Sequence, residues 1–356
     1  MSGPEPNPPA PLTSAERALL AQRAPDGASE RVVLEERLLA DLTVSNMTWQ
    51  GASWRGSQLE RVRFVECTLH GVNWSGAKLT DVTFERCRLI SCRFGDCRLD
   101  RVRFVGGAIE LGRGRRARLH DCAFEDVAVV GPLFEGSELF RLHHRGGRLS
   151  WHLSGCQLTQ WSLSDVKLDD ARLTLCHGDS AALRNCEVAG LSWRGGRWSQ
   201  LTFEGGKLVD LSLVEVEAES VALSQPKALS QLNMNDCRLA VLAIKACPVV
   251  YDLHLVACKI GRLALSQSTF SGAWVTKCEL GPGSQVASST LEGTFWDETQ
   301  SRDMTFRAVT IKELLCARGA RFTSLKLVDV RYASDLKLVL EGAQFDAGDR
   351  FGKAAP

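Results

Sequence analysis

The sequence predicts an all-β chain wound into a solenoid with four short sides in each coil. Three observations support this fold class. Large apolar residues recur every five positions, a small or β-branched residue lies two positions before most of them, and residues of one kind recur every 20 positions. A period of five fits neither the turn of a helix nor the strict alternation of a long strand, but it fits a short strand followed by a corner.

The large apolar residues, here called centres, keep one frame over the first part of the pattern. They are Trp49, Trp54, Leu59, Phe64, Leu69, Trp74, Leu79, Phe84, Leu89, Phe94, Leu99, Phe104 and Ile109. Every fourth centre is of one kind, as in the column Phe64, Phe84, Phe104 and Phe124. Four sides of five residues therefore make one coil, and like residues are expected to stack on successive coils. One-residue slips of the frame after Leu139 are expected to be bulged corners.

These residues resemble the pentapeptide-repeat family, whose members fold as a right-handed quadrilateral β-helix. The family motif is A-(D/N)-L-x-x, and the small residue and the central Leu or Phe match it here. The Asp or Asn between them is mostly replaced by Arg or Thr, as in V-R-F at 62–64, C-T-L at 67–69 and C-R-L at 87–89. The resemblance therefore indicates a divergent member of the family.

Four segments follow from the pattern. Residues 1–12 are polar and proline-rich and are predicted to be disordered, and residues 346–356 to be a flexible C-terminus. Residues 13–41 are predicted to be a helical cap, because Thr13 and Glu16 form a capping box that opens a short helix to about Arg23, before a turn at Pro25–Gly27. Residues 42–345 are the β-helix. Within it, 106–118 and 281–303 break the pattern and are expected to be loops or distorted sides.

The evenly spaced Cys87, Cys92 and Cys97 raise the question of a metal site. Zinc sites bring thiolates together in close pairs such as C-x2-C, which this spacing does not match. Twelve of the 13 cysteines occupy the small position before a centre, so we expect buried, apolar thiols rather than ligands. No metal or cofactor is therefore expected, and the odd number of cysteines favours a reducing compartment.

Catalytic residues are not predicted either. His143 and His144 are adjacent, so they face opposite sides of a strand, and a distorted side is preferred there over a metal or catalytic role. Acidic residues are scattered beside Arg or Lys, and no nucleophile elbow, phosphate loop or H-E-x-x-H motif occurs. The chain is therefore predicted not to be an enzyme and to have no small-molecule substrate.

The candidate partner-binding residues lie in or near the two irregular stretches. They are Arg113, Arg115, Arg116, Arg118, Arg141, Arg145 and Trp296. The arginines are interpreted either as part of a solvated loop without a binding role, or as a site for an acidic partner or nucleic acid. With 43 basic and 42 acidic residues, the net charge of +1 disfavours nucleic acid.

The leading functional hypothesis is a non-enzymatic scaffold that binds other proteins. The resemblance implies a context, as an accessory, adaptor or cargo protein of a bacterial, type VI-like secretion system. The alternative that it implies is a DNA mimic that protects DNA gyrase, which would need a strongly negative face. A β-helical enzyme acting on polysaccharide would need clustered carboxylates and ranks last.

Location and assembly are inferred from the absence of signals. The polar start and the lack of a run of about 18 apolar residues predict a cytoplasmic protein with no membrane partner. Such a start is also compatible with export by a system that reads no signal peptide. Protein partners are expected, and a homodimer through a coil end is one arrangement.

Overall fold

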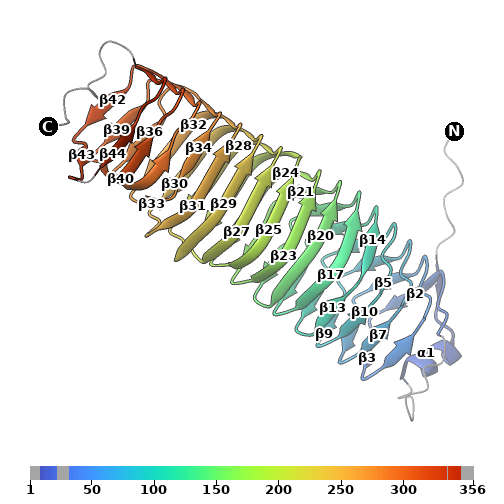
Figure 1. Ribbon diagram of the computed structural model, residues 1–356. Helices are drawn as coiled ribbons and strands as arrows, with labels where there is room; N and C mark the ends of the chain where they lie inside the picture. The colour runs from blue at the N-terminus through green and yellow to red at the C-terminus, as the bar shows by residue number, and fades with distance from the viewer. Residues whose placement is uncertain (1–8, 22–31, 335, 346–356) are drawn as a thin grey trace, which may run out of the picture. The chain divides into compact units, whose positions relative to one another are not determined.

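The computed structural model describes residues 9–21, 32–334 and 336–345. The chain forms two compact units, Met1–Val166 (unit 1) and Lys167–Pro356 (unit 2). Within each unit, short parallel strands stack coil upon coil (Figure 1). The predicted fold class, a nearly all-β solenoid with four sides, is therefore confirmed.

Unit 1 is built from columns of parallel strands, one column for each side of the coil. The side that carries the leucine column consists of β2 (Arg37–Ala40), β5 (Gln58–Glu60), β8 (Lys78–Thr80), β11 (Arg98–Asp100), β15 (Arg118–His120), β18 (Glu138–Phe140) and β21 (Gln157–Thr159). The phenylalanine column lies on β3 (Thr43–Ser45), β6 (Arg63–Val65), β9 (Thr83–Glu85), β12 (Arg103–Val105), β16 (Ala123–Glu125), β19 (His143–Arg145) and β22 (Trp161–Ser164).

The other two sides of unit 1 differ in regularity. The third side consists of β4 (Thr48–Gln50), β7 (Thr68–His70), β10 (Arg88–Ile90), β13 (Ala108–Glu110), β17 (Ala128–Glu135) and β20 (Arg148–Ser154). The fourth is a row of isolated parallel bridges joining Val33, Ser53, Asn73, Arg93 and Arg113, continued by β14 (Arg113–Arg115). Short strands separated by corners account for the five-residue period.

The stacking register confirms the predicted columns. Phe64 pairs with Phe84, and Phe104 pairs with Phe84 and Phe124. Their rings stack nearly parallel, with centroid separations of 4.9, 5.0 and 4.8 Å from one coil to the next. These separations match the spacing of about 4.8 Å between paired strands. Residues 20 positions apart therefore lie directly over one another on successive coils.

A residue with positive φ turns the chain at each corner. In the first coils these residues are Asp41, Asn46, Gly51, Gly56 and Arg61, with φ between 53° and 67°. The left-handed region is unfavourable for residues other than glycine. Ladder hydrogen bonds hold the corners in it, as where the Arg61 amide donates to the carbonyl of Thr80 in the next coil at 3.0 Å.

A register shift marks the frame slip in unit 1. Between Val130 and Leu133, the pairing of β17 with β20 changes from a spacing of 20 residues (Ala128 with Arg148) to one of 19 (Leu133 with His152). The bulge absorbs the missing residue, so the centres continue to face inward. This slip is therefore a bulged corner, as predicted.

Unit 2 begins with longer strands that bend across two sides. They form two parallel series. One consists of β23 (Lys167–Thr174), β25 (Glu187–Arg194), β27 (Lys207–Val214), β29 (Ala228–Asn235) and β31 (Val250–Val256). The other consists of β24 (His177–Arg184), β26 (Arg197–Glu204), β28 (Glu217–Ser224), β30 (Arg238–Lys245) and β32 (Lys259–Ser266).

The remainder of unit 2 returns to mostly short strands. They are β33 (Thr269–Ser271), β34 (Trp274–Thr276), β35 (Glu279–Leu280), β36 (Gln285–Ala287), β37 (Thr290–Phe295), β38 (Gln300–Arg302), β39 (Thr305–Arg307), β40 (Thr310–Cys316), β41 (Arg321–Thr323), β42 (Lys326–Val328), β43 (Arg331–Tyr332), β44 (Lys337–Val339) and β45 (Gln344–Phe345). A second register shift lies between Glu292 and Thr294.

The N-terminal cap is close to the prediction. Helix α1 (Ser14–Ala21) begins with a reciprocal capping box, in which the Thr13 amide donates to Glu16 Oε2 at 2.7 Å and the Glu16 amide donates to Thr13 Oγ1 at 3.2 Å. Part of the stretch predicted to be disordered is a strand, since β1 (Ala10–Pro11) pairs with Arg37 and Leu38. That pairing covers the strand edge of the first coil.

The predicted tails are only partly described. Residues 1–8, the turn at Pro25–Gly27 and residues 346–356 lie outside the described part of the chain. Among the described residues, no helix is long and apolar enough to cross a membrane.

Neither of the two stretches expected to be loops or distorted sides leaves the strand columns, although the second contains the register shift between Glu292 and Thr294. Residues 106–118 contain β13, β14 and the start of β15, and residues 281–303 contain β36, β37 and β38. Gly114 fits because the ring of Phe134, from the next coil, takes the missing side chain's space: a Cβ on Gly114 would lie 2.4 Å from Phe134 Cδ1. Trp296 lies in the core and is 2% exposed.

The cysteines point into the core, as predicted. Cys87, Cys92 and Cys97 are free thiols and at most 2% exposed. Their Sγ atoms lie near backbone carbonyls, as where Cys97 donates to Trp74 O at 2.7 Å. Burial raises the pKa of Cys92 and of Cys97 to about 12, so these thiols stay neutral at physiological pH.

His144 replaces phenylalanine in its column without distorting the side. Its ring lies parallel to that of Phe124, with centroids 5.4 Å apart, and the residue is 1% exposed. The neighbouring His143 faces outward, with Nδ1 2.6 Å from Ser162 Oγ. The two histidines therefore face opposite sides as predicted, but the expectation of a distorted side is wrong.

Candidate interaction surfaces

Four of the predicted arginines of unit 1 form two groups, Arg113 with Arg115 and Arg116 with Arg141. Arg113 and Arg115 lie on β14 on either side of Gly114, and both side chains are exposed. They line a hollow of about 310 Å³, together with Ser75, Arg93, Gly95, Gly114, Leu133 and Glu135. The geometry therefore places these two arginines on an open surface, where they can meet a partner.

The other group is neutralised by carboxylates one coil away. Arg116 donates from Nε and Nη2 to both carboxylate oxygens of Asp96, at 2.7 and 2.9 Å. Arg141 makes the same two-bond contact with Asp121. The guanidinium beside each carboxyl holds the pKa of Asp96 and of Asp121 below its usual value. Arg116 and Arg141 are thus already paired.

The remaining candidates differ in exposure and in ion pairing. Arg118 pairs with Glu138 at 3.1 Å. Arg145 is exposed at the end of β19. Trp296 packs its ring edge-on against Phe306, with centroids 5.9 Å apart. Because Trp296 is buried, the expectation that it contacts a partner is wrong. The single large apolar residue in this polar stretch is a core residue.

A cluster that the sequence did not suggest surrounds His120. Its Nδ1 lies 3.1 Å from Asp100 Oδ1 and 3.0 Å from Asp121 Oδ2, and the three residues have a spacing that could hold a metal ion. The carboxylates already contact guanidinium groups, Asp100 that of Arg101 and Asp121 that of Arg141. These contacts favour a hydrogen-bonded surface network over a metal site.

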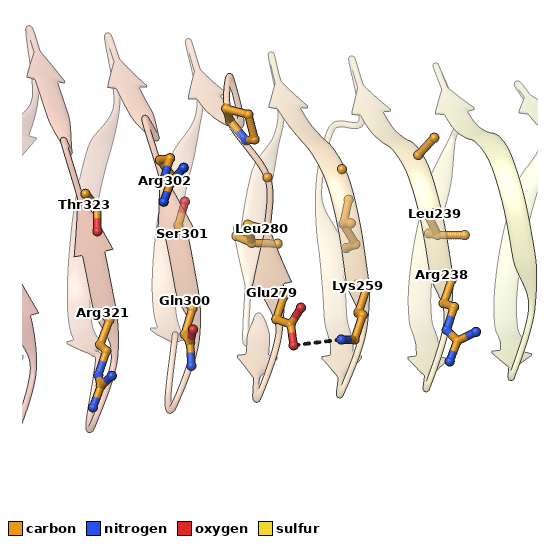
Figure 2. A pocket seen from close by; sticks show the side chains of 15 residues that line it. Arg238, Leu239, Lys259, Glu279, Leu280, Gln300, Ser301, Arg302, Arg321 and Thr323 are labelled. Carbon is orange, nitrogen blue, oxygen red and sulfur yellow. Dashed lines mark ion pairs between the residues drawn. The ribbon is translucent and has the colours of Figure 1, made fainter.

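An open hollow on the surface of unit 2 is called the trough below. It has a volume of about 740 Å³ and follows one side of the coil from β30 to β41 (Figure 2). Its floor is the column of buried centres Leu239, Ile260, Leu280 and Ser301, which stack in register.

Two rows of residues flank this floor. The row that precedes the centres carries long side chains, namely Arg238, Lys259, Glu279, Gln300 and Arg321 (Figure 2). The row that follows the centres begins with Ala240, Gly261 and Gly281, which leave the backbone uncovered. A Cβ on Gly281 would lie 2.3 Å from the carbonyl oxygen of Gly261, so the close stacking there requires glycine.

The trough is predominantly basic. It is lined by Arg238, Lys259, Arg302 and Arg321 against the single acid Glu279, which pairs with Lys259 at 3.0 Å (Figure 2). Arg238 pairs with Glu217 at 3.2 Å. Within the described residues, Arg302 and Arg321 have no ion-pair partner. Two uncompensated guanidinium groups thus lie at one end of the trough.

A buried hydroxyl lies at the same end. Ser301 occupies a centre position where neighbouring coils carry Leu280 and Phe322, and it is 5% exposed. Its Oγ has no hydrogen-bond partner among the described residues. Buried polar groups are normally satisfied. The combination of a small side chain and an unsatisfied donor makes this part of the trough suited to a polar group.

The fold and the columns define a repeat protein of the parallel β-solenoid class, with five residues to each side. The family model "Pentapeptide repeats (8 copies)" matches residues 75–106, which lie in the regular coils of unit 1. The resemblance to the pentapeptide-repeat family is therefore confirmed over these residues. No curated protein matches the sequence significantly.

Two solved structures illustrate the similarity. Full-length QnrB1, a plasmid-mediated fluoroquinolone resistance protein, is 18% identical over 44% of this chain and 88% of that chain, with a TM-score of 0.16. HetL, a pentapeptide repeat protein involved in heterocyst differentiation regulation from the cyanobacterium Nostoc, is 13% identical over 90% of this chain and 91% of that chain, with a TM-score of 0.10. Superpositions with such low TM-scores support no inference about function.

Proposed function

We propose that the protein is a non-enzymatic scaffold that binds other proteins, and that the trough is its contact surface for an extended, acidic segment of a partner. The observation that carries the proposal is the pairing of an open trough, with Gly261 and Gly281 along one rim, with the uncompensated Arg302 and Arg321. Long side chains on one rim, and the small residues Ala240, Gly261 and Gly281 along most of the other, leave room for a chain lying along the trough.

Charge and shape favour an acidic segment over an apolar one. Guanidinium groups form strong, two-bond contacts with carboxylates. The floor centres are buried, so the trough offers little apolar surface to cover. Carboxylates meeting Arg302 and Arg321 would add ion pairs without opening the existing Lys259–Glu279 pair.

Variants of the trough test the proposal. The double change Arg302→Gln and Arg321→Gln removes the free charges, and Ala240→Trp places a large side chain in the trough from an exposed position on its rim. Arg307→Gln is the matched control, because Arg307 is an exposed arginine of β39 that does not line the trough. Crosslinking from native lysate should recover a partner with the wild type and the control, and lose it with both trough variants.

A defined probe makes the same test independent of the lysate. A fluorescent peptide of alternating Glu and Ala should bind the wild type more tightly than its Gln counterpart. The Arg302→Gln, Arg321→Gln protein should lose this preference. Equal binding of the Glu peptide by the double variant and by Arg307→Gln would show that the trough is not the contact surface.

The secretion context remains a proposal that rests on the resemblance to divergent family members. We propose that the partner is a component of a bacterial, type VI-like secretion system, which the protein serves as accessory, adaptor or cargo. Identification of the crosslinked partner tests this point. A partner unrelated to secretion would remove the context while leaving the scaffold proposal intact.

A DNA mimic that protects gyrase is less well supported. Such a mimic needs a row of carboxylates, but one corner column of unit 1 alternates in sign through Asp41, Arg61, Asp81, Arg101, Asp121 and Arg141. Arg61, Arg101 and Arg141 each pair with the preceding Asp. A supercoiling assay in which the protein changes neither gyrase activity nor its inhibition by a fluoroquinolone would remove this alternative.

A further inference from the structure

Many arginines in unit 1 face a carboxylate from a neighbouring coil. Examples are Arg61 with Asp41, Arg101 with Asp81, Arg116 with Asp96 and Arg103 with Glu125. The parallel register brings residues about 20 positions apart next to each other, so opposite charges at that spacing pair across coils.

Arg93 and Arg113 break this rule. They form a parallel bridge with each other, and the next residue in this row, Leu133, also carries no negative charge. Arg115 projects from the same side, between Gly95 and Glu135 of the adjoining coils. Within the described part of the chain, none of the three arginines has an ion pair. Like charges at strand spacing repel each other, so the arrangement favours a bound anion.

The hollow around these arginines can admit such an anion. Its volume is about 310 Å³, and Gly95 and Gly114 contribute no side chains to it. A Cβ built on Gly95 would make only ordinary contacts, the nearest of them with Ser75 Oγ at 3.5 Å. Arg93, Arg113 and Arg115 all line the hollow, and Glu135 is the one acidic residue among its lining residues.

The charge balance of the hollow selects the class of anion. Three arginines and one glutamate give a formal charge of +2. A phosphate monoester carries about −1.5 to −2 at neutral pH, whereas a phosphodiester carries one negative charge, and guanidinium groups bind phosphate oxygens through two parallel hydrogen bonds. We propose that the hollow of Arg93, Arg113 and Arg115 is a binding site for a phosphate monoester dianion.

Titration of the full-length protein tests this site. The probes are inorganic phosphate, phosphoserine and a short phosphoserine peptide, with dimethyl phosphate and a duplex oligonucleotide as comparisons. Calorimetry should show saturable binding of at least one monoester probe and weaker binding of both comparisons. Affinity should fall as the pH decreases through about 6, where the dianion takes up a proton. Tighter binding of the peptide than of phosphoserine would identify a protein-borne phosphate as the source.

Variants locate the binding. Arg93→Gln or Arg113→Gln should weaken monoester binding at least tenfold. Arg103→Gln should change it less than twofold, because Arg103 is similarly exposed and already pairs with Glu125 at 2.8 Å. Side-chain NMR signals of the arginines in the wild type give a measurement that needs no variant, and those of Arg93, Arg113 and Arg115 should shift on addition of phosphate.

Several outcomes would overturn the proposal. They are the absence of saturable binding to the wild type, equal losses in Arg103→Gln and Arg113→Gln, or tighter binding of the oligonucleotide than of every monoester. The test does not involve the trough in unit 2, so its failure would leave the proposed scaffold function standing.

Discussion

The imidazole of His144 lies parallel to the ring of Phe124, at an interplanar angle of 6° and a centroid separation of 5.4 Å. It thereby continues a column that phenylalanine fills in four preceding coils. Unlike phenylalanine, it brings two ring nitrogens into the core, and neither has a hydrogen-bond partner among the described residues.

The first prediction concerns the pH dependence of stability. Burial lowers the pKa of His144 from 6.5 to about 4, so the unfolded chain binds the proton more readily than the folded one. The unfolding free energy should be unaffected by this group above about pH 6.5, and should fall as the pH decreases from there to 4, by roughly 3 kcal/mol in total.

Denaturation of the His144→Phe variant checks this effect. Phenylalanine restores the column and removes two unsatisfied nitrogens, so the variant should be more stable by about 1–3 kcal/mol at neutral pH. It should also lose the His144 contribution to the pH slope between 6.5 and 4, whereas a change at the exposed His143 should leave that slope in place. Identical slopes for wild type and His144→Phe would contradict the interpretation.

The second prediction concerns the packing of Phe134 against Gly114. Gly114→Ala should destabilise the protein by about 1–3 kcal/mol, since the new methyl group overlaps the Phe134 ring and something must shift. Gly95→Ala is the matched control, because its Cβ meets nothing closer than 3.5 Å. Combining Gly114→Ala with Phe134→Leu should cost less than the sum of the single changes in urea denaturation. Additive losses would show that the two residues do not compete for space.

The third prediction concerns the buried thiols. Cys92→Ala should cost about 1 kcal/mol of stability and leave partner binding unchanged, because Cys92 only fills space in the core. Iodoacetamide at pH 8 should modify Cys92 only after unfolding, as read by mass spectrometry. Rapid modification in the native protein, or loss of a bound metal in the variant, would be inconsistent with an inert core thiol.

The fourth prediction separates corner geometry from ion pairing. Arg101 has a φ of 54° and pairs with Asp81, so Arg101→Ala and Arg101→Gly lose the same ion pair. The glycine variant should be more stable by about 1 kcal/mol, because only glycine adopts this φ without strain. At Arg103, within strand β12, the order should reverse, with alanine more stable than glycine. Thermal unfolding of the four variants gives both comparisons.

The fold could be predicted well from the sequence because positions that stack on one another carry the same kind of residue. Phe64, Phe84 and Phe104 occur 20 residues apart because they lie over one another, so periodicity reports contact directly. Gly114 was wrongly assigned to a loop because a glycine at a centre position indicates an interrupted pattern. In the structure, the ring of Phe134, 20 positions away, occupies the space that a side chain at Gly114 would fill. The pattern does not show which neighbouring ring fills a gap.

The functional surfaces were harder to predict for a related reason. Arg113 and Arg115 were recognised from local charge, but Arg116 and Arg118 were grouped with them although Asp96 and Glu138 neutralise them from other coils. The trough was missed. The sequence does contain a signal for it, because a small residue follows three successive centres of this side, at Ala240, Gly261 and Gly281. The spacings are 21 and 20 residues, and the frame slips made this repeat hard to recognise.

The 20-residue register of unit 1 has a consequence for how such a chain can change in length. A duplication of twenty codons would add one complete coil and leave every column in phase, wherever its ends fell. An insertion of one codon would instead require a bulge like that between Val130 and Leu133. Genes for such proteins can therefore grow or shrink by tandem duplication and deletion while the core residues keep their partners.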